Sequence, residues 1–179
     1  PAESATCLVI PQRDTAPVRS PLLDDAAHAL ALSVRAHGAF SGKLGEVYFI
    51  PQTGDGACGI LLVGLGPDAA PDAEKIRRAG GKSIESLRTH RITHLAMDCE
   101  SHRWPVQHFV EGVVLGQYRF DRYKKADPDA FTGAVEEVFL VANKADALND
   151  ELAACRSAAQ VCTNANWARD LANAAANDM

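Results

Sequence analysis

Long hydrophobic runs and paired cysteines are both missing from this sequence of 179 residues. No stretch approaches the roughly 20 apolar residues that a membrane-spanning helix needs, so we expect no membrane partner. The five cysteines are an odd number without a C-x-x-C pair, which indicates buried thiols in a reducing compartment. A large excess of positive charge is also absent. The formal net charge of −5 argues against a general nucleic-acid binder.

The composition that remains is that of one folded domain. Hydrophobic residues make up 47% of the chain and charged residues 23%, which is the usual mixture for a globular protein. A chain of this length can bury a core without disulfides or a metal. The apolar run at residues 7–10 follows no basic segment and is stopped by Pro11, so it predicts a short strand and not a signal peptide.

Strand-like and helix-like segments alternate along the chain. After the first strand and a loop over 11–20, we expect strands over 47–50, 59–65, 92–97 and 135–141. We expect helices over 21–34, 72–88 and 105–118, and one long helix or two over 146–176. Gly38 is expected to end the first helix. The second and third strands flank a glycine-rich turn and predict a hairpin. This alternation predicts a single α/β domain whose mixed, mainly parallel sheet is covered on both faces.

The Gly-Leu-Gly turn at residues 64–66 follows a strand, as a nucleotide-binding loop would. The dinucleotide fingerprint needs a third glycine where Ala69 stands, and Pro67 and Pro71 occupy positions at which a helix N-terminus would hold phosphate. There is no G-K-S or G-K-T loop either. We therefore interpret Gly64 and Gly66 as parts of a tight strand-to-helix turn and predict no cofactor-binding residue.

Histidine and cysteine residues gather in one region and raise the question of a metal site. The set consists of His90, His94, Cys99, His102 and His108. The four-residue spacing of the first two loses its meaning because a helix is expected to end at the first and a strand to contain the second. No cysteine pair supplies the other half of a structural zinc site. We expect loop and surface histidines and predict no metal ligand.

Nucleophilic and acid–base residues form no catalytic arrangement in the sequence. The serines that lie outside any G-x-S-x-G elbow are Ser41, Ser83, Ser86, Ser101 and Ser157. Cys99 with His102 is better explained by packing at a strand end. The acidic pairs at 24–25 and 136–137 suit a helix start and a strand edge. No catalytic residue is predicted.

Two glycines, Gly112 and Gly116, share one stripe of a predicted helix. Glycine lowers helix propensity, so a pair on one stripe needs a structural reason. We expect them to let this helix approach the sheet closely.

Three segments, taken in order, resemble the leucyl aminopeptidase (cytosol aminopeptidase) family. The first is L-L-V-G-L-G at 61–66, followed by R-R-A-G at 77–80. The second and most specific is E-G-V-V-L-G-Q-Y-R-F-D-R-Y-K at 111–124, which looks like the family signature E-G-x-x-L-G-x-Y-x-F-D-x-Y-K. The third is N-W-A-R-D-L-A-N at 166–173, similar to the family's N-x-A-R-D-L-x-N, although alanines at 174–176 stand where the family often has Thr-Pro-Pro. The match covers nearly all of the chain from residue 47 onward.

The resemblance implies a fold for this chain and a separate domain for catalysis. In the family this part is a macro-like unit, which implies a three-layer α/β/α domain over residues 1–165, with residues 166–179 opening the link to a C-terminal catalytic domain. That domain hydrolyses N-terminal residues, often leucine, from peptides with two divalent metals (zinc, manganese or magnesium). Its N-T-D-A-E-G-R-L motif does not occur here. The resemblance therefore carries no catalytic, cofactor-binding or metal-ligating residue to this chain.

The implied role is assembly and regulation, with the segment alone inactive. The family's N-terminal domain helps to build a cytoplasmic homohexamer, and its own catalytic domain and peptide substrates are the other implied partners. Two alternatives stay open. One is a stand-alone macro-type module that binds ADP-ribose or another nucleotide, suggested by the strand and Gly-x-Gly turn. The other, less favoured, is a DNA-binding regulatory domain with basic runs such as residues 75–78.

Overall fold

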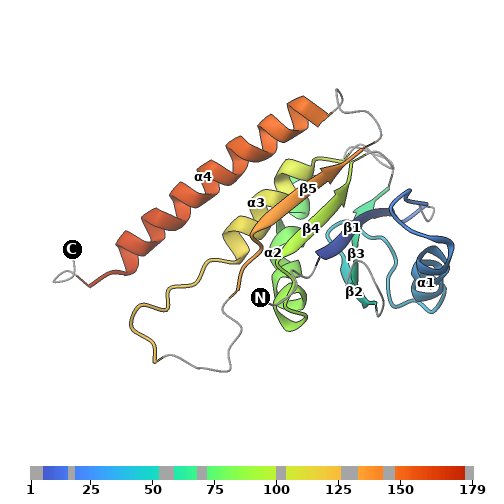
Figure 1. Ribbon diagram of the computed structural model, residues 1–179, viewed down its shortest axis with the longest axis horizontal. Helices are drawn as coiled ribbons and strands as arrows, with labels where there is room; N and C mark the ends of the chain where they lie inside the picture. The colour runs from blue at the N-terminus through green and yellow to red at the C-terminus, as the bar shows by residue number, and fades with distance from the viewer. Residues whose placement is uncertain are drawn as a thin grey trace.

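The computed structural model describes residues 6–15, 19–52, 59–67, 72–99, 104–125, 133–142 and 148–175. Within these ranges five strands form one sheet in the order β2-β3-β1-β4-β5 (Figure 1). The strands are β1 (Thr6–Arg13), β2 (Val47–Pro51), β3 (Gly59–Gly66), β4 (His94–Asp98) and β5 (Glu137–Val141). β2 pairs antiparallel with β3, and the other pairs are parallel. The predicted hairpin and the mixed, mainly parallel sheet are confirmed.

Helices cover both faces of this sheet. They are α1 (Asp25–Ala36), α2 (Ala73–Thr89), α3 (Val106–Gly116) and α4 (Asn149–Asn173). α1 covers the face opposite to α2 and α3, and α4 lies along the outside of α3 instead of on the sheet (Figure 1). The predicted three-layer fold is confirmed, and α4 is added outside it. None of the described helices combines the length and apolar character that a membrane span requires.

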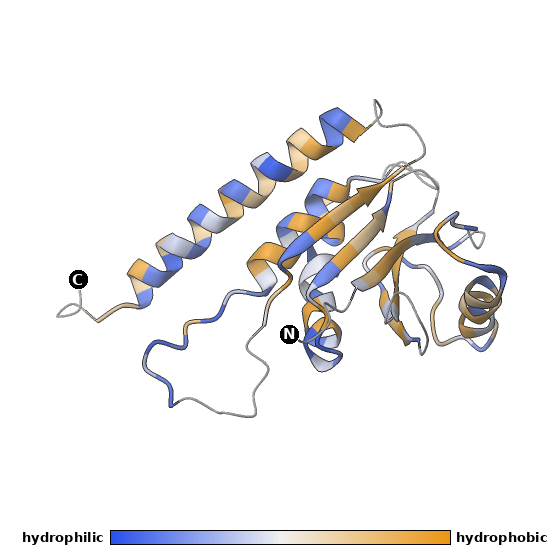
Figure 2. Ribbon diagram, in the orientation of Figure 1, coloured by the Kyte–Doolittle hydropathy of each residue, from blue (hydrophilic) through white to orange (hydrophobic). Residues whose placement is uncertain are grey.

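The alternation of side chains along each strand separates two hydrophobic cores. Val9 and Leu61 point toward α2 and α3, whereas their neighbours Ile10 and Leu62 point toward α1. Every residue of β3 is buried, as expected for a central strand that is apolar on both faces. Figure 2 shows the strands as the most hydrophobic stretches of the ribbon. Full burial of one such side chain contributes about 1.5–3 kcal/mol, so these strands supply much of the stability.

Two predicted boundaries near the N-terminus were wrong. Pro11 does not stop β1, because β1 pairs with β4 only as far as Val9 and continues along β3 to Arg13. The proline therefore lies where β4 has already ended, so its missing N–H interrupts no β1–β4 pair. The first helix begins at residue 25 and not at 21, because the Asp24 carboxylate caps it by accepting from the backbone N–H of Ala27 at 2.7 Å.

The other elements lie close to their predicted positions. Gly38 follows the C-cap of α1 with φ of +72°, which confirms it as the stop of that helix. α4 is a single helix, and it is continuous across residues 165 and 166. The predicted domain boundary at that point therefore remains a prediction.

α2 and α3 pack closely against each other where four glycines lie at their crossing point. Gly80 and Gly81 lie on α2, and Gly112 and Gly116 lie on α3. A Cβ atom at Gly112 would overlap the carbonyl oxygen of Arg77, and one at Gly116 would lie 2.9 Å from the Cα of Gly81. We expected the glycines of α3 to allow a close approach of this helix to the sheet. That expectation was wrong, because the element that packs against them is α2. A stripe of small residues on one helix does not identify its partner.

Candidate functional site

The Gly64 turn is closed by the protein's own backbone. Gly64 donates its N–H to the carbonyl of Glu46 at 2.8 Å, and Gly66 donates to the carbonyl of Gly42 at 2.9 Å. A Cβ atom at Gly64 would overlap the carbonyl oxygen of Lys43, which explains the glycine. The amides of both glycines of the turn are therefore used within the fold. This arrangement supports the tight-turn interpretation.

The Glu46 side chain, which the sequence does not single out, holds the 42–46 segment in place. Its carboxylate accepts from the backbone N–H and hydroxyl of Ser41 at 3.0 and 2.8 Å and from the backbone N–H of Lys43 at 3.1 Å. Burial acts to raise the pKa of Glu46, but these hydrogen bonds outweigh it and the net shift is downward. The carboxylate is therefore a fixed acceptor for this segment.

The structure does not gather the candidate metal ligands. His90 stacks on Phe49 with ring centroids 4.1 Å apart, and His94 lies 3.7 Å from the carboxylate of Glu137. His108 contacts Glu111 at 3.2 Å. The Cys99 thiol donates to the carbonyl of Met97, and His102 lies outside the described residues. In the part of the chain that the structure describes, no three His, Cys, Asp or Glu side chains are placed to hold a metal ion.

The candidate nucleophiles are also dispersed. The hydroxyl of Ser83 donates to the carbonyl of Gly80 within α2, and Ser41 serves Glu46. Ser86 lies on α2, Ser157 lies on α4, and Ser101 falls outside the described residues. Asp24 is the helix cap that its position suggested.

Asp98 forms a buried polar cluster that sequence reasoning missed. It lies at the carboxyl end of β4 and is 1% exposed. Its carboxylate accepts from the hydroxyl of Ser20, and its backbone carbonyl accepts from the indole N–H of Trp104 at 3.0 Å. The cluster ties the turn before α1 to the central sheet. No sequence pattern links Ser20 with Asp98, because they are 78 residues apart.

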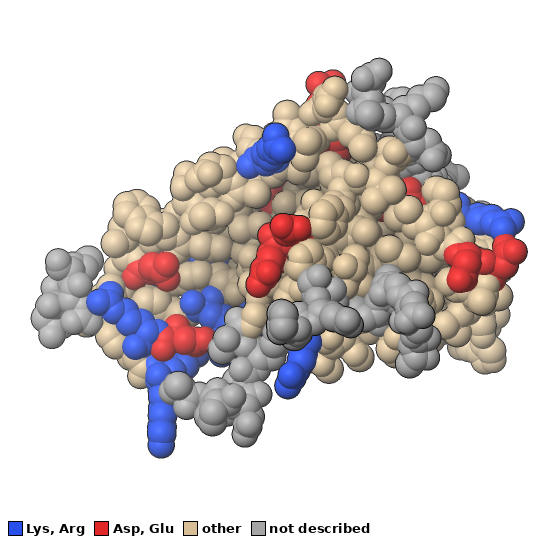
Figure 3. All heavy atoms as spheres, viewed as in Figure 1, with Lys and Arg blue, Asp and Glu red and all other residues tan. Residues whose placement is uncertain are grey.

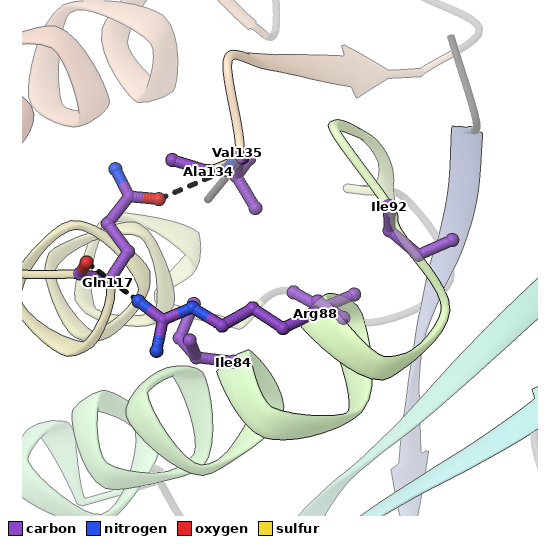
Figure 4. Close-up of a pocket in the computed structure, with 8 residues that line it drawn as sticks. Ile84, Arg88, Ile92, Gln117, Ala134 and Val135 are labelled. Atoms are coloured by element: carbon purple, nitrogen blue, oxygen red, sulfur yellow. Dashed lines mark hydrogen bonds between the residues drawn. The ribbon is translucent and has the colours of Figure 1, made fainter. Parts of the chain in front are cut away.

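A cavity between the C-terminal end of α2 and the segment before β5 is too small for a ligand. Its volume is about 10 Å³, which is at most the space of one water molecule. Arg88 donates to the backbone carbonyl of Gln117 at 2.8 Å, and the side chain of Gln117 accepts from the N–H of Val135 at 3.1 Å (Figure 4). Burial lowers the pKa of Arg88. These bonds join the ends of α2 and α3 to the segment before β5.

The two most specific sequence segments meet in space. The α3–α4 junction, defined here as residues 114–124 and 166–175, is formed by the end of α3, the chain that follows it, and the last turns of α4. Asn166 donates its side-chain N–H to the carbonyl of Val114 at 2.9 Å, and Arg169 donates to the carbonyl of Leu115 at 3.4 Å. Since the last carbonyls of a helix have no partner within it, these side chains satisfy groups that the end of α3 leaves open.

Two tyrosines complete the α3–α4 junction. The guanidinium of Arg169 lies 5.4 Å from the centre of the Tyr118 ring, and Asn173 contacts the Tyr118 hydroxyl at 3.2 Å. The backbone N–H of Ala175 donates to the Tyr123 hydroxyl at 2.8 Å. The signature segment after α3 therefore holds the C-terminal end of α4 and fixes its direction.

A half-buried ion pair holds the first residue of the signature segment 111–124. Arg77 on α2 contacts the carboxylate of Glu111 on α3 at 2.6 Å, and Glu111 also contacts His108. The hydrogen bond to Glu111 raises the pKa of Arg77. This first residue of the signature therefore fastens α3 to α2.

An open groove lies beside the α3–α4 junction. It has a volume of about 590 Å³ and is lined by Arg119, Phe120, Asp121, Arg122, Trp167, Asp170, Leu171 and Ala174. We call it the junction groove. Trp167 is 64% exposed and Leu171 is 44% exposed. Its chemistry is that of a binding surface with an apolar centre and charged margins, and it contains no assembled nucleophile and base.

Comparisons with known proteins agree with this geometry. Residues 11–127 match the family described as "Cytosol aminopeptidase family, N-terminal domain". A "probable cytosol aminopeptidase" of Syntrophotalea carbinolica is 34% identical over 164 residues, which cover 87% of this chain and 33% of that protein. One of the same description from Persephonella marina is 31% identical over 115 residues, or 58% of this chain and 23% of the relative. The chain thus spans about a third or less of the length of these curated relatives.

Solved structures show the same fold. A mutant tomato leucine aminopeptidase has a TM-score of 0.68 at 18% identity, covering 99% of this chain and 37% of that one. The bottromycin maturation enzyme BotP has a TM-score of 0.65 at 23% identity, covering 97% and 34%. A further structure of BotP is described as a complex with Mn. At these identities the likeness is one of fold.

Proposed function

Since this chain belongs to the cytosol aminopeptidase family as its N-terminal domain, we propose that it is the non-catalytic assembly and regulatory domain of a longer leucyl aminopeptidase. The observation that carries the proposal is the extent of the match. Residues 11–127 correspond to the family's N-terminal domain, and the Syntrophotalea carbinolica relative is about three times as long as the segment that it shares with this chain. The longer protein removes N-terminal residues, preferably leucine, from peptides in the cytoplasm.

The chemistry of the longer protein belongs to its C-terminal part. Two divalent metals bound there would supply an activated water and a polarised scissile carbonyl. The described residues of this chain do not fit such a metal pair, because their His, Cys, Asp and Glu side chains form no group of three that could hold an ion. We therefore derive no catalytic step from them.

This domain holds the catalytic domain in a defined orientation. Hydrogen bonds from Asn166 and Arg169 to the end of α3, and from Ala175 to Tyr123, fix the direction in which α4 leaves the domain. A helix held at its far end transmits a defined orientation to whatever follows it. The domain thereby positions its catalytic partner within a homohexamer.

Hydrolysis of leucine p-nitroanilide in the presence of manganese tests the proposal. The 179-residue chain is compared with the same chain joined in frame to the part of the Syntrophotalea carbinolica relative that follows the matched region. We expect hydrolysis by the joined protein and none by the chain alone. Activity in the purified chain, or an inactive but folded joined protein, would contradict the proposal.

Two other functions receive less support. Nucleotide binding at the Gly64 turn is opposed by the use of its amides within the fold, and we expect calorimetry with ADP-ribose to give no heat above background. For DNA binding, Figure 3 shows acidic side chains beside the basic ones on the visible face. We expect no gel shift even at low salt, where phosphate contacts are strongest.

A further inference from the structure

The junction groove exposes large apolar side chains that the domain itself does not bury. The two tryptophans differ sharply, because Trp104 is 4% exposed and belongs to the core whereas Trp167 is 64% exposed. Leu171 follows one turn later on the same side of α4 and is 44% exposed. Tryptophan, tyrosine and arginine are the residues enriched at the energetic centres of interfaces. An exposed tryptophan beside arginines is therefore typical of a docking surface, and Leu171 extends its apolar area.

Folding of the domain gives no reason for this arrangement. Of the 25 residues of α4, only Cys155 and Cys162 are buried, and both lie before the groove. Neither Trp167 nor Leu171 belongs to either core cluster. Their exposure costs about 25 cal/mol for each Å² of apolar surface that could otherwise be buried. A partner that covers them would recover this free energy.

The margins of the groove indicate the chemistry of the partner. Asp121 is already engaged by Arg119 at 2.7 Å and by Lys124 at 2.9 Å, and these hydrogen bonds lower its pKa. Arg122 and Asp170 stand at the rim with opposite charges. Because the charges are mixed, a strongly acidic ligand such as nucleic acid gains little here. The surface fits a protein segment with an apolar side chain at its centre and polar groups of both signs around it.

The position of the groove identifies the segment. It is lined by the last two turns of α4, the final helix of the described chain, and about two thirds of the length of the Syntrophotalea carbinolica relative lies outside the match. Chain that continues from α4 is tethered beside the groove at an effective concentration in the millimolar range. We infer that the junction groove is the docking surface for the catalytic domain of the longer protein, with Trp167 and Leu171 as the apolar anchors of the groove. This inference rests on the proposed function.

Acrylamide quenching of tryptophan fluorescence tests the inference directly. The signal of Trp167 is the difference between the wild type and Trp167→Phe, and it is compared in the 179-residue chain and in the joined protein described above. We expect quenching of Trp167 to fall about threefold or more in the joined protein, as for a side chain buried in an interface. Unchanged quenching would overturn the inference. If the joined protein does not fold, the C-terminal part of the relative is added as a separate protein and judged by the same criterion.

A concentration series identifies the competing occupant. If Trp167 of the chain alone becomes protected between about 1 and about 100 μM, a second copy covers the groove and the inference is overturned. Hydrolysis of leucine p-nitroanilide by the same samples judges the proposed function separately. Protection of Trp167 without hydrolysis would support the docking surface and refute the proposed function. Hydrolysis without protection of Trp167 would support the proposed function and refute the docking surface.

A matched pair of variants locates the surface on α4. Leu171→Ser removes an anchor without disturbing the core, so we expect it to restore quenching of Trp167 in the joined protein by about twofold or more. Val161→Ser changes a side chain that is also 64% exposed on α4 but lies outside the junction groove. It is expected to leave the protection intact. Equal effects of the two variants would overturn the assignment of the groove.

Discussion

The α2–α3 crossing and the attachment of α4 lie on the same side of the sheet but are built in opposite ways. In α2, six of 17 residues are buried, and in α3 five of 11. In α4, only two of 25 are buried. The crossing brings two backbones together through glycines, whereas α4 is held by side chains that reach the carbonyls of α3. The first region serves the fold, and the second presents a surface.

This difference shows how one domain combines closely packed helices with an outer helix that is held by separate hydrogen bonds. Close packing of the two backbones leaves little room for change, since a Cβ atom at Gly80, Gly112 or Gly116 would overlap the facing helix. A helix attached by separate hydrogen bonds can lose one of them without unfolding the domain. The predictions below test whether the two regions differ in this way.

The largest effect is expected at the crossing. Gly112→Ala places a methyl group against the carbonyl of Arg77, so the helices must separate. We expect a loss of about 2–3 kcal/mol in the free energy of unfolding in urea, even though alanine favours the helix. Gly81→Ala is the matched control. Its nearest neighbour would be the carbonyl of Gly112 at 3.7 Å, an ordinary contact, so the same change should be neutral or stabilising by up to about 1 kcal/mol. Similar losses in both variants would refute the crossing as described.

An intermediate effect is expected where α4 meets the core. Burial raises the pKa of the Cys155 thiol to about 12 from an ordinary value of 9.0. Between these values the folded chain keeps a proton that the unfolded chain loses, so this stability is complete below pH 9 and is lost as pH rises toward 12. We expect the urea stability of the wild type to fall more steeply than that of Cys155→Ala above pH 9, by up to about 1.4 kcal/mol per pH unit.

The comparison between the two curves isolates the thiol from other groups that titrate at high pH. The control is Ser157→Ala, two residues away on the same helix. It retains the Cys155 thiol, so its stability should depend on pH as that of the wild type does. Parallel curves for wild type and Cys155→Ala would show that this part of α4 is open to water.

The smallest effect is expected at the far end of α4. Asn166→Ala removes the hydrogen bond to the carbonyl of Val114 but adds a better helix former. We expect a change of less than about 0.5 kcal/mol in global stability. Amide hydrogen exchange of residues 167–173 should nevertheless accelerate about fivefold, because this end opens locally. Gln160→Ala is the control, since Gln160 bonds only within α4, to Asn164. Acceleration in the control as well would indicate general fraying.

Hydrophobic periodicity predicted the order and type of the helices and strands in the described part of the chain, because burial on one or both faces leaves a periodic pattern of apolar residues. It failed where the answer depended on a partner. Pro11 is tolerated in β1 because β4 ends early, and Gly112 faces α2 instead of the sheet. Neither fact can be read from the residue and its chain neighbours.

The candidate site shows the same limit. Composition and spacing favoured a tight turn at Gly64 over a phosphate loop, but they could not reveal that residues 42–46 pack against it. The resemblance marked residues 111–124 and 166–173 as specific, yet their meeting in the α3–α4 junction is visible only in the fold. The bond between Ser20 and Asp98 was missed for the same reason, since it joins distant segments.

The 42–46 segment competes with any nucleotide phosphate for the backbone amides of the Gly64 turn. It is part of the same molecule, so its effective concentration exceeds that of any free nucleotide and is never diluted. A descendant of this domain could not acquire a phosphate site at that turn by changing one contacting residue. It would first have to release the segment, and with it the carboxylate of Glu46 that anchors the entrance to β2. Binding of a nucleotide at this turn would therefore require displacement of a segment that is bound through both backbone and side-chain hydrogen bonds.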